Sequence, residues 1–95
     1  MALKIILAED DKIFRKVVAD MLKNQGYTVL EAGDGSEALG LFYQHPETSL
    51  LIFDVMMPEM NGWQALKELR QQSDVPVMML TALGDEQHEV KGFQI

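Results

Sequence analysis

The chain has 95 residues, of which 47% are hydrophobic, so it is long enough for one small domain and too apolar for a disordered segment. Its formal net charge of −7 argues against binding of nucleic acid or of an anionic membrane, because phosphate contacts need clustered Lys and Arg. It contains no Cys, which excludes a disulfide framework and a thiolate metal site, and no apolar run is long enough to cross a membrane. We therefore expect a cytoplasmic protein.

The first half of the chain predicts two strand–helix units. Residues 4–8 form a short apolar run that ends on acidic residues, which is typical of a buried strand. Residues 12–25 change to helical periodicity. The apolar side chains expected on the inner face of this helix are Phe14, Val17, Val18, Met21 and Leu22. Residues 27–32 predict a second strand, and a second helix is expected from Ser36 to near Pro46.

The second half repeats this arrangement. Residues 50–54 predict a strand that ends on Asp54, and a turn over residues 58–62 follows it. Residues 63–72 have helical periodicity, and residues 75–80 predict a fourth strand. A last helix is expected after this strand, capped by Asp85, with Val90 and Phe93 facing inward.

Four strands that alternate with helices predict an α/β fold with a parallel sheet, right-handed crossovers and helices on both faces. The first and third strands are the most apolar, so we expect them at the centre, and the second strand carries polar residues that suit an edge. The expected strand order is therefore 2-1-3-4. Parallel strands end at the same sheet edge, and the residues that this places together are Glu9, Asp10, Asp54 and Thr81.

The fourth predicted strand is as apolar as a central strand, yet nothing in the sequence is expected to cover its outer edge. Because a long apolar edge promotes aggregation, we expect that a fifth strand and helix are missing or come from another chain. The open fourth strand, together with the last helix, would offer a surface for a homodimer.

Carboxylates on neighbouring strand ends repel one another unless a cation lies between them. Strand spacing of about 4.8 Å brings Asp10 and Asp54 close together, with Glu9 beside them. Mg²⁺ suits such a site, and the backbone carbonyl of Met56 could complete the protein ligands. An ionised Asp54 beside Mg²⁺ could then accept a phosphoryl group. The alternative is that these acids are solvated caps and turn residues.

Three segments of the chain, residues 5–11, 53–62 and 75–82, resemble the receiver domain of two-component response regulators. The resemblance implies that residues 1–95 form one receiver domain of the flavodoxin-like, doubly wound type, without its fifth strand–helix unit. It also implies signal transduction by phosphorelay, so that the domain is a phosphoacceptor and not a turnover enzyme.

The resemblance gives each matched residue a role. Asp54 corresponds to the acceptor of a phosphoryl group from a histidine kinase, and Glu9 and Asp10 to the acidic pair that binds Mg²⁺ with the carbonyl of Met56. Thr81 corresponds to the hydroxyl that moves to the phosphoryl group when the domain switches and signals to an output domain or partner protein.

The sequence departs from the family pattern beyond the fourth strand. Receivers carry a Lys at the end of the fifth strand, and Lys91 lies in the expected last helix, so that role is not transferred to it. Phosphorylation of this segment alone should therefore be slower or absent, because transition-state stabilisation is largely electrostatic. Residues 79–85 are similar to receivers joined to winged-helix DNA-binding domains, although nothing in this segment is expected to bind DNA.

Two other functions stay open from the sequence. One is a truncated or domain-swapped receiver that acts only as an interaction module. The other is a Mg²⁺-dependent phosphotransferase acting on a small molecule. Haloacid dehalogenase-type enzymes carry a second Asp two residues after the nucleophile, and Met56 at that position counts against them.

Overall fold

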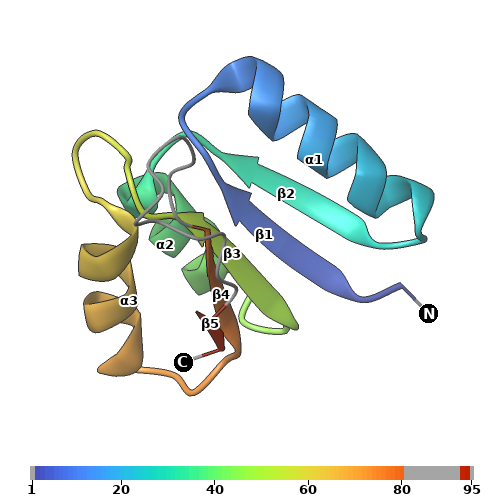
Figure 1. Cartoon of the computed structure of the whole chain (residues 1–95). Helices are drawn as coiled ribbons and strands as arrows, with labels where there is room; N and C mark the ends of the chain where they lie inside the picture. Colours follow the sequence, from blue (N-terminus) through green and yellow to red (C-terminus); the bar gives the residue numbers. More distant parts are fainter. Residues whose placement is uncertain (1, 81–92, 95) are drawn as a thin grey trace.

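The computed structural model describes residues 2–80 and 93–94. Its strands form one five-stranded sheet with the order β2-β1-β3-β4-β5 (Figure 1). The first four strands pair in parallel, and β5 is antiparallel to β4. The strands are β1 (Lys4–Ala8), β2 (Thr28–Ala32), β3 (Leu50–Asp54), β4 (Val77–Leu80) and β5 (Phe93–Gln94). The predicted α/β fold and the predicted order 2-1-3-4 are confirmed.

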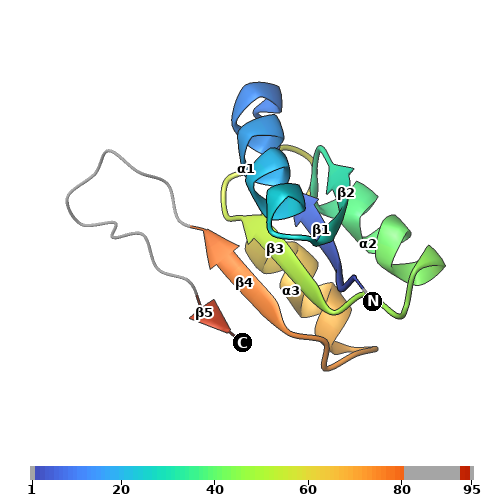
Figure 2. The ribbon, with the colours of Figure 1, turned by 90° about the vertical axis from the view of Figure 1, so that its right-hand side faces the viewer.

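Helices cover both faces of this sheet, as Figure 2 shows. The described helices are α1 (Lys12–Asn24), α2 (Gly35–Gln44) and α3 (Gly62–Arg70). The main core lies between the sheet and the pair α2 and α3, and a smaller core lies under α1 on the opposite face. Alternate residues of β1 belong to the two cores, Ile6 to the first and Ile5 to the second, which explains why this strand is apolar throughout.

Each described helix begins at a side chain that accepts hydrogen bonds from free backbone N–H groups. Asp11 accepts from Ile13 and Phe14 at 3.0 Å, and therefore caps α1 as predicted. Asp34 caps α2, which starts one residue before the predicted Ser36. Asn61 forms a capping box with Gln64 at the start of α3, so the end of the predicted turn is already the beginning of a helix.

The predicted inner face of α1 is largely wrong. Phe14, Val17 and Met21 are 43%, 50% and 62% exposed, and the buried residue of this helix is Ala19. Its apolar contacts with the sheet come from a narrower stripe in which Val18 and Leu22 flank Ala19. The reason is that α1 lies over β1 and β2 at one side of the sheet, and no other described helix lies beside it on that face.

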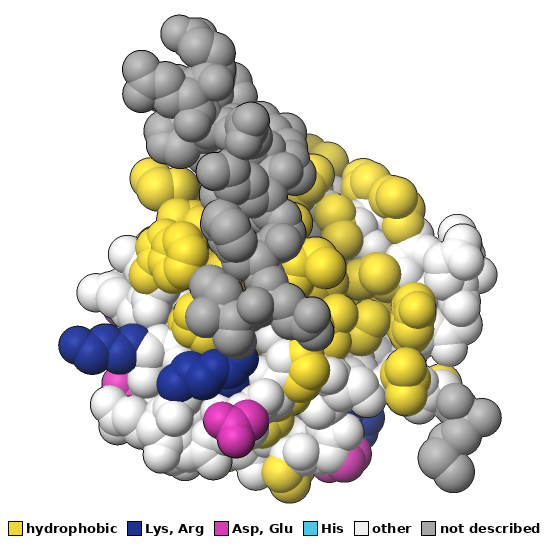
Figure 3. Space-filling model, turned by 60° about the horizontal axis from the view of Figure 1, so that its bottom comes forward, with side chains coloured by type: hydrophobic (Ala, Val, Ile, Leu, Met, Phe, Trp, Pro, Cys, Tyr) yellow, Lys and Arg dark blue, Asp and Glu magenta, His cyan; other side chains and the backbone are white. Residues whose placement is uncertain are grey.

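An apolar groove on the same face follows from this arrangement. Strands β1, β3 and β4 supply its floor, and α1 and the residues around it supply one wall. Figure 3 shows hydrophobic side chains spread over the right half of this face, with a further group at the left. The apolar residues that line the groove are Leu3, Ile5, Leu22, Tyr27, Leu50, Ile52, Pro76 and Met78.

The outer edge of β4 also differs from the expectation. Met78 pairs with Gln94 and Met79 with Phe93, so part of this edge is covered by the chain itself. Phe93 therefore lies in a strand and not in the expected helix, because the free N–H and C=O groups of β4 offer it backbone partners. The expected cap and inward residue of that helix, Asp85 and Val90, lie outside the described residues.

The exposure of α1 leads to a stability prediction. Replacing Val17 or Met21 by Gln should change the free energy of unfolding by less than about 0.5 kcal/mol, because both side chains are exposed and neither is part of the core. Replacing the fully buried Leu69 by Ala should cost about 2–5 kcal/mol. Urea denaturation of the variants measures both effects. A cost at Val17 or Met21 as large as that at Leu69 would show that this face is buried in solution.

Candidate functional site

Three acidic side chains meet where β1 and β3 end. These strands are parallel neighbours, with Ala8 opposite Phe53, so that the residues following Ala8 come beside Asp54. Oxygen atoms from the carboxylates of Glu9, Asp10 and Asp54 all lie within 4.8 Å of one another. The structure therefore brings together the three acids that the common sheet edge predicts.

Glu9 is the buried member of this group, with 5% of its surface exposed. Burial raises the pKa of its carboxyl from the ordinary 4.5 to about 7, and the neighbouring Asp54 and Asp10 act in the same direction. A hydrogen bond of 2.9 Å from the backbone N–H of Asp11 to Oε2 of Glu9 lowers the pKa and limits this rise. Near pH 7, the Glu9 carboxyl is therefore partly protonated in the metal-free protein.

Asp54 and Asp10 are more accessible than Glu9. Asp54 is half-buried at the end of β3, where its Oδ1 accepts a hydrogen bond of 3.2 Å from the backbone N–H of Met56. Asp10 is exposed. The third consecutive acid, Asp11, is used differently, because its carboxylate caps α1. One buried and two accessible carboxylates therefore form the site.

The loop from Val55 to Asn61 is held closely between its neighbours. The backbone N–H of Gly62 donates to the carbonyl of Val55 at 3.1 Å, and that of Gly35 donates to the carbonyl of Met60 at 3.1 Å. A Cβ atom on Gly62 would lie 2.6 Å from the carbonyl oxygen of Asp54, and one on Gly35 would lie 2.6 Å from that of Met60. Glycine at both positions lets the two helices begin directly against the loop.

A cation that the sequence patterns did not predict, Arg15, contacts this site. Arg15 donates from Nη1 to the backbone carbonyl of Glu9 at 2.8 Å, and its Nε lies 3.3 Å from Oε1 of Glu31 on β2. The spacing in the sequence could have indicated this position. Arg15 follows the cap Asp11 by about one helical turn, so its side chain lies near the strand ends. The predicted switch residue Thr81 lies outside the described residues.

The donor atoms of this site suit a hard divalent cation. All three side chains offer carboxylate oxygens, with no sulfur or imidazole nitrogen among them, and Mg²⁺ and Ca²⁺ prefer such ligands. Met56, the expected carbonyl ligand, lies in the loop directly after Asp54. The residues present therefore fit the cation that the sequence predicts.

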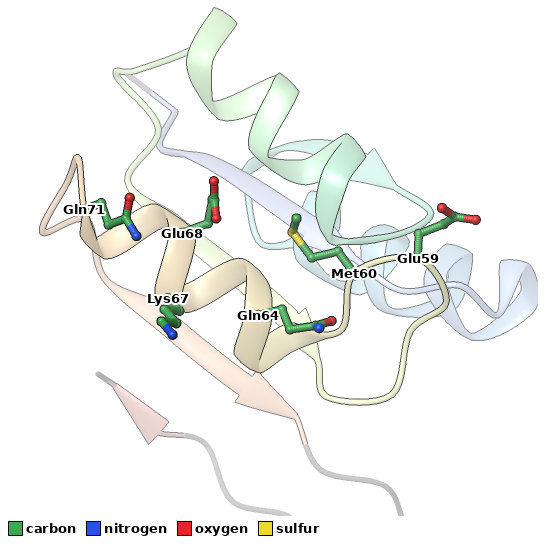
Figure 4. A pocket seen from close by; sticks show the side chains of 6 residues that line it. All are labelled: Glu59, Met60, Gln64, Lys67, Glu68 and Gln71. Atoms are coloured by element: carbon green, nitrogen blue, oxygen red, sulfur yellow. The ribbon is translucent and has the colours of Figure 1, made fainter.

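A separate pocket lies along α3 (Figure 4). Its lining combines two acids and one Lys with amides and a thioether, and none of the three clustered acids contributes to it. Glu59 and Met60 of the loop after β3 form one end, and Glu59 has a positive φ of 65°, which is uncommon for a residue with a side chain. The lining residues are Glu59, Met60, Gln64, Lys67, Glu68 and Gln71.

The fold and this site together define a class of protein. It is a flavodoxin-like domain with an acidic cluster at the topological switch point between β1 and β3. The family model for the response regulator receiver domain matches residues 5–95. The chain therefore belongs to the response regulator receiver domain family, as its sequence motifs indicated.

Named relatives agree with this assignment. The chain is 44% identical over 92 residues to the transcriptional regulatory protein CpxR of Klebsiella pneumoniae, with 97% of this chain and 39% of that protein covered. It is 39% identical over 93 residues to response regulator RR06 of Streptococcus pneumoniae serotype 2, with 98% and 42% covered. The chain spans 36–42% of the length of the curated relatives it matches.

Solved structures show the same fold. Chemotaxis protein CheY4 of Vibrio cholerae matches with a TM-score of 0.81 and 33% identity over 92% of this chain and 74% of that chain. A response regulator receiver domain protein from Clostridium thermocellum matches with a TM-score of 0.80 and 26% identity over 90% and 69%. Among the described residues, no helix is both long and apolar enough to span a membrane.

The raised pKa of Glu9 predicts how stability depends on pH. In the metal-free protein, the protonated Glu9 stabilises the fold fully below its unfolded pKa of 4.5, and this contribution is lost as the pH rises through about 7. Each unit of pKa difference corresponds to about 1.4 kcal/mol. Urea denaturation in EDTA between pH 5 and pH 8 should show a fall for the wild type and a flatter profile for Glu9→Gln. Parallel profiles would contradict the raised pKa.

The close approach of Gly62 to β3 predicts a second effect on stability. Gly62→Ala should destabilise the protein by about 1–3 kcal/mol, since the added carbon overlaps the fixed backbone oxygen of Asp54. Gly40→Ala is the matched control in α2, because a Cβ there meets nothing within 4 Å and Ala favours a helix. In thermal denaturation, the Tm of Gly40→Ala should be higher than that of the wild type, and the Tm of Gly62→Ala should be lower. The reverse order would exclude the close contact.

Proposed function

We propose that this domain accepts a phosphoryl group on Asp54 from the phosphohistidine of a histidine kinase, in the presence of Mg²⁺. The observation that carries this proposal is the cluster of three carboxylates within 4.8 Å at the carboxyl ends of β1 and β3, in a chain of the receiver family. We assign the reaction to Asp54 because it ends β3 itself and is more accessible than the buried Glu9, and because it corresponds to the phosphoacceptor in the receiver motif.

The reaction uses one oxygen of the Asp54 carboxylate as the nucleophile. That oxygen forms a bond to phosphorus, the bond between phosphorus and the kinase imidazole breaks, and the imidazole nitrogen keeps the electron pair. The product is an acyl phosphate on Asp54. The domain catalyses its own phosphorylation and the later hydrolysis of the acyl phosphate, which releases inorganic phosphate and restores Asp54, so it is a phosphoacceptor and not a turnover enzyme.

Glu9, Asp10, Asp54 and the carbonyl of Met56 would hold the Mg²⁺ ion. Bound there, Mg²⁺ offsets the mutual repulsion of the carboxylates and the charge that develops on the transferred phosphoryl oxygens. The backbone N–H of Met56, already hydrogen-bonded to Oδ1 of Asp54, orients the reacting carboxylate. Glu9 would hold the ion as a carboxylate, the form that its burial disfavours in the metal-free protein.

The partners follow from the same reaction. A histidine kinase supplies the phosphoryl group, and an output domain or partner protein responds to the changed domain, with Thr81 as the switch hydroxyl. The name of one relative, the transcriptional regulatory protein CpxR, supports transcription as the process that such an output controls. We place this signalling in the cytoplasm.

Phosphorylation by a small donor tests the proposal. With acetyl phosphate and Mg²⁺, intact-mass spectrometry should show one added phosphoryl group on the wild type, and the adduct should be cleaved by hydroxylamine. Asp54→Asn should show no adduct. Asp20→Asn is the matched control, since Asp20 is an exposed acid that pairs with Lys16 on α1, and it should be labelled like the wild type.

Chelation of Mg²⁺ by EDTA should abolish the adduct in the wild type and in the control. A folded wild-type chain that takes no phosphoryl group from either acetyl phosphate or a phosphorylated histidine kinase would contradict the proposal and favour a module that only binds partners. Transfer onto an added small molecule, without labelling of Asp54, would indicate the phosphotransferase.

A further inference from the structure

Arg15 connects the acidic site to the neighbouring helix and strand. It lies near the start of α1, where this helix comes beside the ends of β1 and β2 (Figure 1). Its guanidinium group donates to the backbone carbonyl of Glu9 at 2.8 Å and pairs with Glu31 of β2 at 3.3 Å. We propose that Arg15 is a positioning residue that fixes the directions of the Glu9 and Asp10 carboxylates for the bound Mg²⁺ ion. This inference rests on the proposed function.

The atom that Arg15 contacts makes this role specific. The carbonyl of Glu9 belongs to the peptide unit that joins Glu9 to Asp10, and a peptide unit is planar. Fixing that carbonyl limits rotation at the bonds on both sides of the unit, and these rotations determine where the two side chains point. The backbone N–H of Glu9 is fixed separately, by a hydrogen bond of 3.0 Å to the carbonyl of Ala32.

The contact of Arg15 with the carbonyl of Glu9 is partly buried, whereas its ion pair with Glu31 lies at the surface. The side chain is 19% exposed, so it is mostly removed from water, whereas fully exposed pairs contribute little to stability. The Glu31 carboxylate also lies 3.7 Å from Nζ of Lys23, so two cations of α1, Arg15 and Lys23, pair with it. Arg15 is thereby anchored on the β2 side while its other nitrogen reaches the acidic site.

The shape of the guanidinium group is essential to this arrangement. Nη1 and Nε of one rigid plane contact two different strands, a carbonyl after β1 and a carboxylate on β2. A Lys at this position would place a single ammonium group on a flexible chain and could not reproduce that planar fork. Charge alone should therefore not replace Arg15.

The test compares the affinity for Mg²⁺ with stability in the same variants of the whole chain. Partners of metal ligands typically contribute a factor of 10–100 to metal affinity, so Arg15→Met should raise the dissociation constant for Mg²⁺ about tenfold in calorimetry. Arg15→Lys should also weaken binding, by more than about threefold, because it keeps only the charge. Urea denaturation gives the free energy of unfolding of each variant.

Lys23→Met is the matched control, because it removes the other cation on Glu31 and leaves the contact with the Glu9 carbonyl in place. Its dissociation constant for Mg²⁺ should stay within about twofold of the wild-type value, as expected for a group outside the metal site. A purely structural role would instead weaken Mg²⁺ binding in proportion to lost stability in all three variants.

Wild-type affinity for Mg²⁺ in folded Arg15→Met, or in Arg15→Lys if the Met variant does not fold, would overturn the inference. A wild-type chain that binds no Mg²⁺ would overturn the proposed metal site itself, and the positioning role with it. The two failures are distinguishable, because the first leaves Mg²⁺-dependent labelling of Asp54 intact in the wild type.

Discussion

Repulsion among the three carboxylates at the ends of β1 and β3 is the constraint on which the rest of the structure depends. Their oxygens lie within 4.8 Å of one another, and one of the three is buried. Burial and the two neighbouring carboxylates raise the pKa of Glu9, and the backbone N–H of Asp11 hydrogen-bonded to Glu9 moderates this rise. The parallel sheet supplies the rigidity that keeps the acids together, because moving them apart would disrupt the buried pairing of β1 with β3.

The parts of this structure that the sequence predicts are those that local patterns determine. Residues 4–8 and 50–54 are apolar runs that end on acids, and this pattern gives both the strands and the edge at which the acids meet. The polar residues of β2 and the apolar ones of β1 and β3 are sufficient to order the sheet. Asp11 was predictable as a cap because a capping side chain acts on its own helix.

The parts that the sequence does not predict depend on contacts between distant segments. Helical periodicity reveals that Phe14, Val17 and Met21 share a side of α1, but burial requires a second element over them, and periodicity carries no information about that element. The sequence pattern places Phe93 in a helix. In the structure it forms a strand instead, because its backbone pairs with the edge of β4. The contacts of Arg15 cannot be predicted from the sequence, because its long side chain contacts two segments that are distant along the chain and meet only in the fold.

The two glycines that begin α2 and α3 have a consequence for how this sequence can evolve. A single methyl group at Gly62 overlaps the carbonyl oxygen of Asp54, and one at Gly35 overlaps that of Met60. Both oxygens belong to the backbone and cannot rotate away as a side chain can. A larger residue at either position should therefore make the protein less stable, unless the backbone of the loop between Asp54 and Gly62 moves as well. The loop and the two glycines thus constrain one another, so that a change in one is best tolerated with a change in the other.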